Sequence, residues 1–241
     1  MIKFFRQIRK SLLQQNKTGK YFKYAIGEIV LVVIGILLAL QINTWNTGKI
    51  LLEKEKKHLF EIDRDLKTNV ENFEKLREKQ TDVMKKITLL LKDIKEKNPY
   101  TLDFSKRLQS VKGIEEIEII TTGFNSASTF GLDNIRSDSL RSKIILLFDH
   151  KYPNDQSIFK DLGRMHHESL VIPIILKNFT NDEYARPIPN NYQELIKNKE
   201  FVSMLGTRKN LKMALNERLI ELIKASNKLR KNIQKELDRG K

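Results

Sequence analysis

The sequence predicts a mostly all-α protein in which one transmembrane helix precedes an elongated helical bundle with two long antiparallel helices. Two observations favour this fold class: an apolar run near the N-terminus, and heptad-spaced apolar residues both after that run and near the C-terminus. The chain has 241 residues, is 40% hydrophobic and contains no cysteine. It can therefore build a core, and disulfides, thiolate metal sites and cysteine nucleophiles are excluded.

Positive charge is concentrated in residues 1–24, which carry seven Lys or Arg side chains and no acidic one. Because the whole chain holds 45 basic and 30 acidic residues, the remainder holds 38 and 30, mixed along predicted helices. Such mixing is typical of solvated helical surfaces. The net charge of +15 therefore does not indicate nucleic-acid binding, and we expect no nucleic-acid partner.

Residues 25–42 form the apolar run, AIGEIVLVVIGILLALQI, with one charged residue in eighteen. As a helix this run covers about 27 Å, close to the thickness of a bilayer's hydrocarbon core. Its length, the basic block before it and the lack of a small-residue cleavage site favour an uncleaved signal anchor over residues 25–45, rather than a cleaved signal peptide or a buried helix. Aromatic residues expected at the two interfaces flank the run: Tyr21, Phe22, Tyr24 and Trp45.

Three residues of the predicted span are candidates for contact with another helix. Glu28 lies one turn inside the run, where it is either an interfacial carboxylate solvated by lysines such as Lys23 or a group that pairs with a partner helix or carries a proton. Gly35 and Ala39 share one helical face and are small enough to let a second helix approach. We expect the lipid bilayer as a partner, with a second copy of the chain or another membrane protein as candidates on this face.

The excess of Lys and Arg before the span predicts that residues 1–24 stay in the cytoplasm and that residues 46–241 form an extracytoplasmic domain. Within the tail, Ile2, Phe5, Ile8 and Leu12 share a helical face, as in a helix lying on anionic lipid.

The opening residues MIKFFRQIRKSLLQQNKTGKYFKYAIGEIVLVVIGILLALQINTWN resemble those of a membrane-protein family of flavobacteria and their relatives, known as a domain of unknown function. The resemblance is specific over residues 1–46 and weaker afterwards, for example in SDSLRSKIILLFDHKY. It implies a single-pass protein of the inner membrane, and it supplies no activity or catalytic residue.

Apolar residues at heptad spacing predict a helix of about 45 residues after Trp45, stopped by Asn98 and Pro99. Asn69 and Gln80 interrupt its seam and either fix the register or face solvent. The remaining seam residues have coiled-coil spacing: Leu52, Leu59, Ile62, Leu66, Phe73, Leu76, Val83, Ile87, Leu90 and Ile94.

A second amphipathic helix near the C-terminus repeats the pattern. Neither helix is stable alone in water, so we expect it to return antiparallel to the first, with self-pairing in a dimer as the alternative. Its stripe comprises Leu215, Leu219, Leu222, Ser226, Leu229 and Ile233.

Shorter elements are expected between the long helices. Helices are predicted over residues 101–111, 126–135, 137–152 and 154–179, a strand or irregular segment over 114–122, and a loop at ARPIPNN. Ser137 or Asp138 is the expected cap of the third helix, and Pro173 is expected to kink or end the fourth.

No motif indicates catalysis, a cofactor or a metal. His166 and His167 point about 100° apart on a helix, so they do not readily bind one ion even with Glu168, Asp149 and His150 nearby in sequence. The hydroxyl residues Ser126, Ser128 and Thr129 lack a G-x-S-x-G frame.

We therefore expect no enzyme but a protein-interaction or scaffold module held at the inner membrane. The alternatives are a sensor subunit that acts through a partner membrane protein, since a 24-residue tail offers no output domain, and an orphan envelope enzyme.

Overall fold

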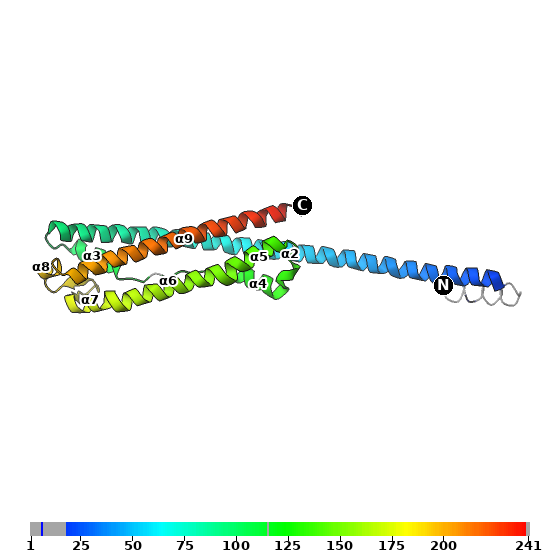
Figure 1. The fold of residues 1–241 in the computed structure, drawn as a ribbon, viewed down its shortest axis with the longest axis horizontal. Helices are drawn as coiled ribbons and strands as arrows, with labels where there is room; N and C mark the ends of the chain where they lie inside the picture. Colours follow the sequence, from blue (N-terminus) through cyan, green and yellow to red (C-terminus); the bar gives the residue numbers. More distant parts are fainter. Residues whose placement is uncertain (1–5, 7–17, 115, 240–241) are drawn as a thin grey trace. The chain divides into compact units, whose positions relative to one another are not determined.

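The computed structural model describes residue 6, residues 18–114 and residues 116–239, and its fold is shown in Figure 1. These residues confirm the predicted mostly all-α class, with two long helices, α2 (Thr18–Glu96) and α9 (Lys199–Arg239). The chain divides into two compact units, Met1–Glu55 and Lys56–Lys241. The predicted division at residues 24 and 45 stays a prediction.

In the first unit the structure describes residue 6 and the part of helix α2 up to Glu55. Helix α2 is long and apolar enough to cross a membrane, and none of its most apolar 18-residue window is buried. The predicted helix with Ile2, Phe5, Ile8 and Leu12 on one face lies outside the described residues.

Helix α2 continues into the second unit and ends where the sequence predicts. Lys97 takes a left-handed conformation, with φ of 53°, and the backbone N–H of Asn98 donates to the carbonyl oxygen of Asp93 at 3.0 Å. A left-handed residue with a returning hydrogen bond is a common helix stop, and Pro99 follows it.

The next elements partly follow the prediction. Helix α3 (Leu102–Val111) agrees with the helix predicted over residues 101–111 and is capped by Thr101, and residues 112–114 and 116–121 are irregular. Helix α4 (Thr122–Phe130) and a 3-10 turn, η1 (Leu132–Asn134), replace the helix predicted over residues 126–135. The predicted bounds are wrong because Gly131, with φ of 101°, ends the helix in a conformation that residues with a side chain rarely adopt.

Residues 138–178 form one unbroken helical run, so the predicted break near residue 153 is wrong. Its elements are α5 (Asp138–Ile145), η2 (Leu146–Lys151), α6 (Tyr152–His166), η3 (His167–Val171) and α7 (Ile172–Asn178). Ser137 caps α5, as predicted.

Two prolines explain why η2 and η3 are π-helical. Pro153 and Pro173 each lie two residues after such a turn. A proline lacks an N–H and its ring crowds the carbonyl four residues back, and a widened turn lets the helix continue past it. Pro173 therefore does not end the helix, so one of the two predicted alternatives is wrong; it lies in the first turn of α7, directly after the widened turn η3.

A small antiparallel hairpin of β1 (Phe179–Asn181) and β2 (Pro187–Pro189) follows, where a loop was predicted. The hydroxyl of Ser105 on α3 donates to the carbonyl oxygen of Pro187 at 2.6 Å and so ties the hairpin to the bundle. Prolines are tolerated there because a two-stranded sheet has only edge strands. A short helix, α8 (Tyr192–Leu195), leads into α9.

Helix α9 lies beside the bundle part of α2 and runs antiparallel to it (Figure 1). Near the C-terminal end of α9, Arg230 forms an ion pair with Asp63 at 3.0 Å. At its other end, Phe201 and Leu205 share a core cluster with Ile87 and Leu90 of α2. The predicted antiparallel return is confirmed.

Two hydrophobic clusters fill the bundle. One joins residues 59–73 of α2 to α4, α5, η2, α6 and residues 211–233 of α9, and the other joins residues 83–94 to α3, α7, α8 and the start of α9. The apolar seam of α2 therefore packs against several elements of its own chain, which does not support the coiled-coil prediction.

Candidate functional site

The aromatic residues predicted at the membrane interfaces are exposed where they are described. Phe22 and Tyr24 precede the apolar window of α2, and Trp45 follows it. The ammonium group of Lys49 lies 3.9 Å from the centre of the Trp45 ring, one helical turn away. This cation–π contact joins an apolar ring to a charged group. Such amphipathic pairs are typical of residues at the level of the lipid headgroups. The side chain of Tyr21 lies outside the described ones.

The three candidate contact residues of the span differ in their surroundings. Glu28 is half-buried and has an interaction partner, whereas Gly35 and Ala39 are exposed. A methyl group added at Gly35 would meet no atom of the described residues within 4 Å, so none of the residues described in the first unit covers this face.

The histidines flagged in the sequence do not meet in one site. Burial and the nearby charge of Arg208 lower the pKa of His166 below its usual 6.5. His150 lies in the π turn η2 and His167 in η3. Among the described residues no three His, Asp or Glu side chains lie close enough together to hold a metal ion.

Ser126 has a histidine neighbour that sequence reasoning missed. Its hydroxyl lies 3.4 Å from Nδ1 of His58 on α2, and a carboxylate oxygen of Glu61 lies 3.3 Å from that same nitrogen. A catalytic triad needs the serine and the carboxylate on opposite nitrogens of the ring, so that one side abstracts a proton while the other orients it. This arrangement instead anchors helix α4 to α2, helped by stacking of Phe130 on His58.

Asn69 and Gln80, which interrupt the predicted seam, are both fully buried. The interpretation that they face solvent is therefore wrong. The side-chain amide of Asn69 donates to the carbonyl oxygen of Ile120 at 2.8 Å and accepts from its N–H at 2.7 Å. This pair of bonds satisfies the backbone of Ile120, a half-buried residue of the irregular segment before α4. Within the described part of the chain, both amide atoms of Gln80 lack a hydrogen-bond partner.

A second contact of this kind is made by the buried carboxylate of Asp65, which lies four residues before Asn69 on α2. Asp65 accepts a hydrogen bond from the backbone N–H of Gly123, at the start of α4. Burial raises the pKa of Asp65 above its usual 3.8, although hydrogen bonds from the N–H groups of Gly123 and Phe124 act in the opposite direction. The contact places a negative charge at the positive end of a helix dipole.

Two more polar contacts join α6 to α9. The hydroxyl groups of Tyr152 and Ser226 lie 2.7 Å apart, and burial raises the pKa of Tyr152 to about 12. The buried carboxylate of Asp155 pairs with Arg218 at 2.8 Å and with Lys151 at 3.3 Å. These groups are held to one another rather than directed into a cleft, and they lock the two helices in one register.

Arg208 and Lys212 of α9 are buried between the two hydrophobic clusters. The guanidinium group of Arg208 donates to the carbonyl oxygens of Val111, at 3.1 Å, and of Gly113. It thereby satisfies carbonyls at the C-terminal end of α3, where a positive charge is favourable. Burial lowers the pKa of Lys212 from 10.5 to about 8.

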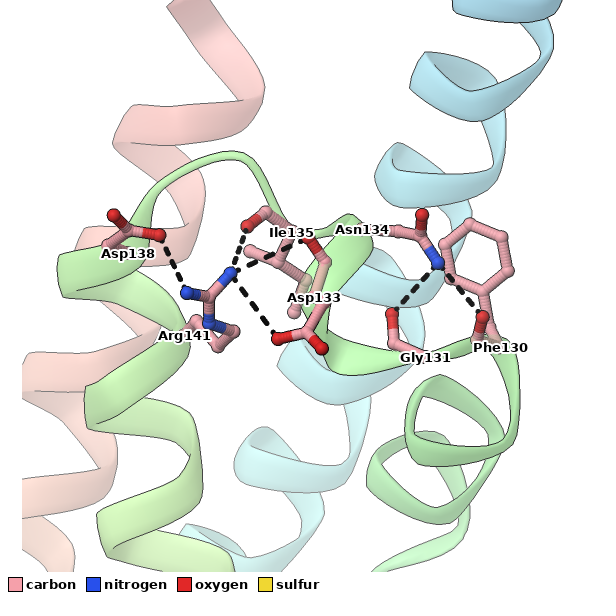
Figure 2. Close-up of polar contacts among 7 residues, drawn as sticks. All are labelled: Phe130, Gly131, Asp133, Asn134, Ile135, Asp138 and Arg141. Atoms are coloured by element: carbon pink, nitrogen blue, oxygen red, sulfur yellow. Dashed lines mark hydrogen bonds and ion pairs between the residues drawn. The ribbon is translucent and has the colours of Figure 1, made fainter.

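A polar network shapes the turn between α4 and α5 (Figure 2). Asn134 donates to the carbonyl oxygens of Phe130 and Gly131 at 3.0 and 3.2 Å, which closes the 3-10 turn. Arg141 reaches back from α5 to the carboxylate of Asp138 at 2.7 Å and to that of Asp133 at 3.8 Å. The network fixes the start of α5 and therefore the face that α5 presents to α9.

A groove of about 200 Å³ lies between this part of the chain and α9. It is lined mainly by Lys143, Leu146, Leu147, Lys151, Lys228 and Leu229. We call this feature the α5–α9 groove. Sequence reasoning missed it, because the pairing of two helices distant in sequence creates it.

Fold and site together define a mostly helical protein with one candidate membrane span among the residues that the structure describes. Comparisons of the chain with protein-family models, with curated proteins and with solved structures each found no match. The resemblance of residues 1–46 to the flavobacterial family therefore stays a prediction.

Proposed function

We propose that this chain is a membrane-anchored protein-interaction or scaffold module, with its N-terminus in the cytoplasm and its helical bundle in the periplasm of a cell with an inner membrane. The observation that carries the proposal is the 18-residue apolar window of α2, of which no part is buried. Exposing such a surface to water is costly, and soluble monomers rarely do so. A bilayer removes that cost.

The bundle supports an interaction role rather than catalysis. Its buried polar groups Asp65, Asn69 and Arg208 bond to the backbone of their own chain, and Asp155 pairs with Arg218. These contacts stabilise the fold of the bundle. The contact between Ser126 and His58 lacks the geometry of an activated nucleophile.

A sensor subunit that acts through a membrane partner is the second candidate. The uncovered face at Gly35 and Ala39 favours it, because small residues on one face of a span let another helix approach closely. Glu28, one turn inside the span, would then pair with a polar group of that helix.

Membrane fractionation tests the anchor. We expect the full-length chain to resist carbonate extraction, and a chain starting near Gly48 to be soluble and strongly helical. A reporter fused after Lys241 should be active in the periplasm. Release of the full-length chain by carbonate would refute the anchor, and cytoplasmic activity of the reporter would reverse the orientation.

In-membrane crosslinking tests the interaction role. Gly35→Ile together with Ala39→Ile should reduce by several-fold the yield of a specific crosslinked product from native membranes. Exchanging Leu37 and Leu38 for Ile serves as the matched control, because it changes the shape of neighbouring positions without filling the small-residue face. Equal yields from both variants would contradict a helix contact at this face.

A further inference from the structure

We propose that the α5–α9 groove binds a single-chain anionic amphiphile, meaning a carboxylate or phosphate head group on an alkyl chain. Such a ligand-binding site goes beyond the scaffold role. All residues that line the groove belong to the second unit, so the proposed site does not depend on whether α2 spans a membrane.

The floor of the groove is apolar. Leu147 and Leu229 come from different helices and are 5% and 3% exposed, so they form a fixed surface rather than mobile side chains. Leu146 stands beside them and is 62% exposed. The exposed leucine and the concave apolar floor together form a surface against which an alkyl chain can bury its apolar area.

The rim of the groove is cationic. Lys143 on α5 and Lys228 on α9 flank the floor, and within the described part of the chain neither ammonium group has an ion-pair or hydrogen-bond partner. Lys151 is already engaged, since it pairs with Asp155 at 3.3 Å and with Glu221 at 3.6 Å.

Among the described residues that line the groove, none carries a carboxylate. Two unpaired ammonium groups on facing helices, above an apolar floor, complement a negatively charged head group rather than a neutral or positive one.

The volume of the groove limits which ligands it can hold. A cavity of roughly 150 Å³ holds one benzene ring, so a groove of about 200 Å³ accommodates only a narrow apolar group. A peptide helix is about 10 Å wide and would rest on the rim instead of entering. An alkyl chain fits along the floor with its head group between Lys143 and Lys228.

Photolabelling tests the proposal with the full chain in phosphatidylcholine nanodiscs. The probe is dodecanoic acid that carries a diazirine on its chain, and the labelled residues are mapped by mass spectrometry. We expect labels in peptides that contain residues 143–151 and 225–232. Decanoate should compete with the probe, whereas decyltrimethylammonium, with the same tail and the opposite charge, should not.

Charge variants separate this site from general adsorption. Lys143→Glu with Lys228→Glu should lower labelling of the groove peptides about tenfold, and Lys143→Arg with Lys228→Arg should keep it. The matched control is Lys75→Glu with Lys106→Glu, which makes the same charge change at exposed lysines outside the groove. Leu146→Asn should lower labelling several-fold while sparing the core, because that side chain is exposed.

Three results would overturn the proposal. The first is equal competition by the cationic amphiphile, which would mean adsorption to apolar surface alone. The second is an equal loss of labelling in the control pair. The third is crosslinking of the groove peptides to a second copy of the chain in place of the probe, which would make the groove a protein-docking surface. Failure of the chain to enter nanodiscs would instead refute the anchor, and the labelling would then be repeated on the chain in solution.

Discussion

At the scale of single residues, Asn69 shows how one side chain positions a whole segment. It is fully buried in the apolar seam of α2, yet both of its amide atoms bond to the backbone of Ile120. Ile120 is a half-buried residue of the irregular segment before α4, where no helix or strand provides partners for these backbone groups. The polar side chain of Asn69 therefore stabilises the bundle, although in the sequence it interrupts an apolar seam.

Replacing Asn69 with Ala should lower the free energy of unfolding by about 1–3 kcal/mol, because the N–H and the carbonyl of the half-buried Ile120 each lose a partner. The measurement is chemical unfolding of the full chain in detergent, followed by circular dichroism. Asn72→Ala on the same helix is the control, since Asn72 is half-buried and outside this contact. A loss of similar size in both variants would show that Asn69 acts through general packing.

Lys212 should give the bundle a characteristic pH dependence. Its pKa is about 8 in the fold, against 10.5 for a free lysine, because the side chain is buried. Between these values the unfolded chain binds more protons than the folded one, so stability should rise as the pH increases from about 8 to 10.5.

Lys212→Met should remove that rise, and Lys209→Met, a half-buried lysine on the same helix, should keep it. The melting temperatures of the three proteins across this pH window provide the measurement. If the curves of the parent and Lys212→Met run parallel, Lys212 is not the group that titrates.

At the scale of elements, helix α4 approaches the backbone of α2 as closely as a glycine allows. A methyl group built at Gly123 would lie 2.4 Å from the backbone carbon of Glu61 and 2.8 Å from the nitrogen of Ile62. Backbone atoms of a long helix do not move aside as a flexible side chain does. The glycine therefore sets the distance between the two helices, and Asp65 holds the start of α4 at that distance.

Gly123→Ala should lower the free energy of unfolding by about 1–3 kcal/mol, the usual cost of overpacking. Gly206→Ala should instead raise it by about 0.5–1 kcal/mol, because a methyl group there meets no atom within 4 Å and alanine favours a helix. Both variants are measured by the same denaturant titration. A neutral effect of Gly123→Ala would mean that α4 can shift away from α2 without cost.

The elements that periodicity predicts are the long ones. The heptad seams of α2 and α9 recur often enough to define a helix and its buried face, and the stops at Asn98 and Pro99 are local signals. The continuous run through Pro153 and Pro173 was not predictable in the same way, because a π turn depends on neighbours that hold the helix together. The contact of His58 with Ser126, and the α5–α9 groove, join residues 68 or more positions apart and have no local signature.

At the scale of the molecule, the second unit is a bundle in which α9 packs antiparallel to α2. Two hydrophobic clusters lie one after the other along α2 and α9, with Gln80, Arg208 and Lys212 between them. Apolar clusters tolerate sliding of one helix past another. The polar contacts do not, because the ion pair between Asp63 and Arg230 and the hydrogen bond between Tyr152 and Ser226 form in one register only. We infer that the polar contacts select the register and the apolar ones supply most of the stability.

The antiparallel return can be tested in solution because the chain has no native cysteine. In the variant Asp63→Cys with Arg230→Cys, a short bismaleimide should join the two positions within one chain, since the parent side chains form an ion pair at 3.0 Å. The product should migrate faster than the uncrosslinked chain on a denaturing gel. Asp63→Cys with Lys209→Cys is the control, because Lys209 lies toward the opposite end of α9, and it should give no intramolecular product. If the first pair gives only products of twice the mass, the seams are paired between two copies of the chain, and the bundle is an intermolecular one.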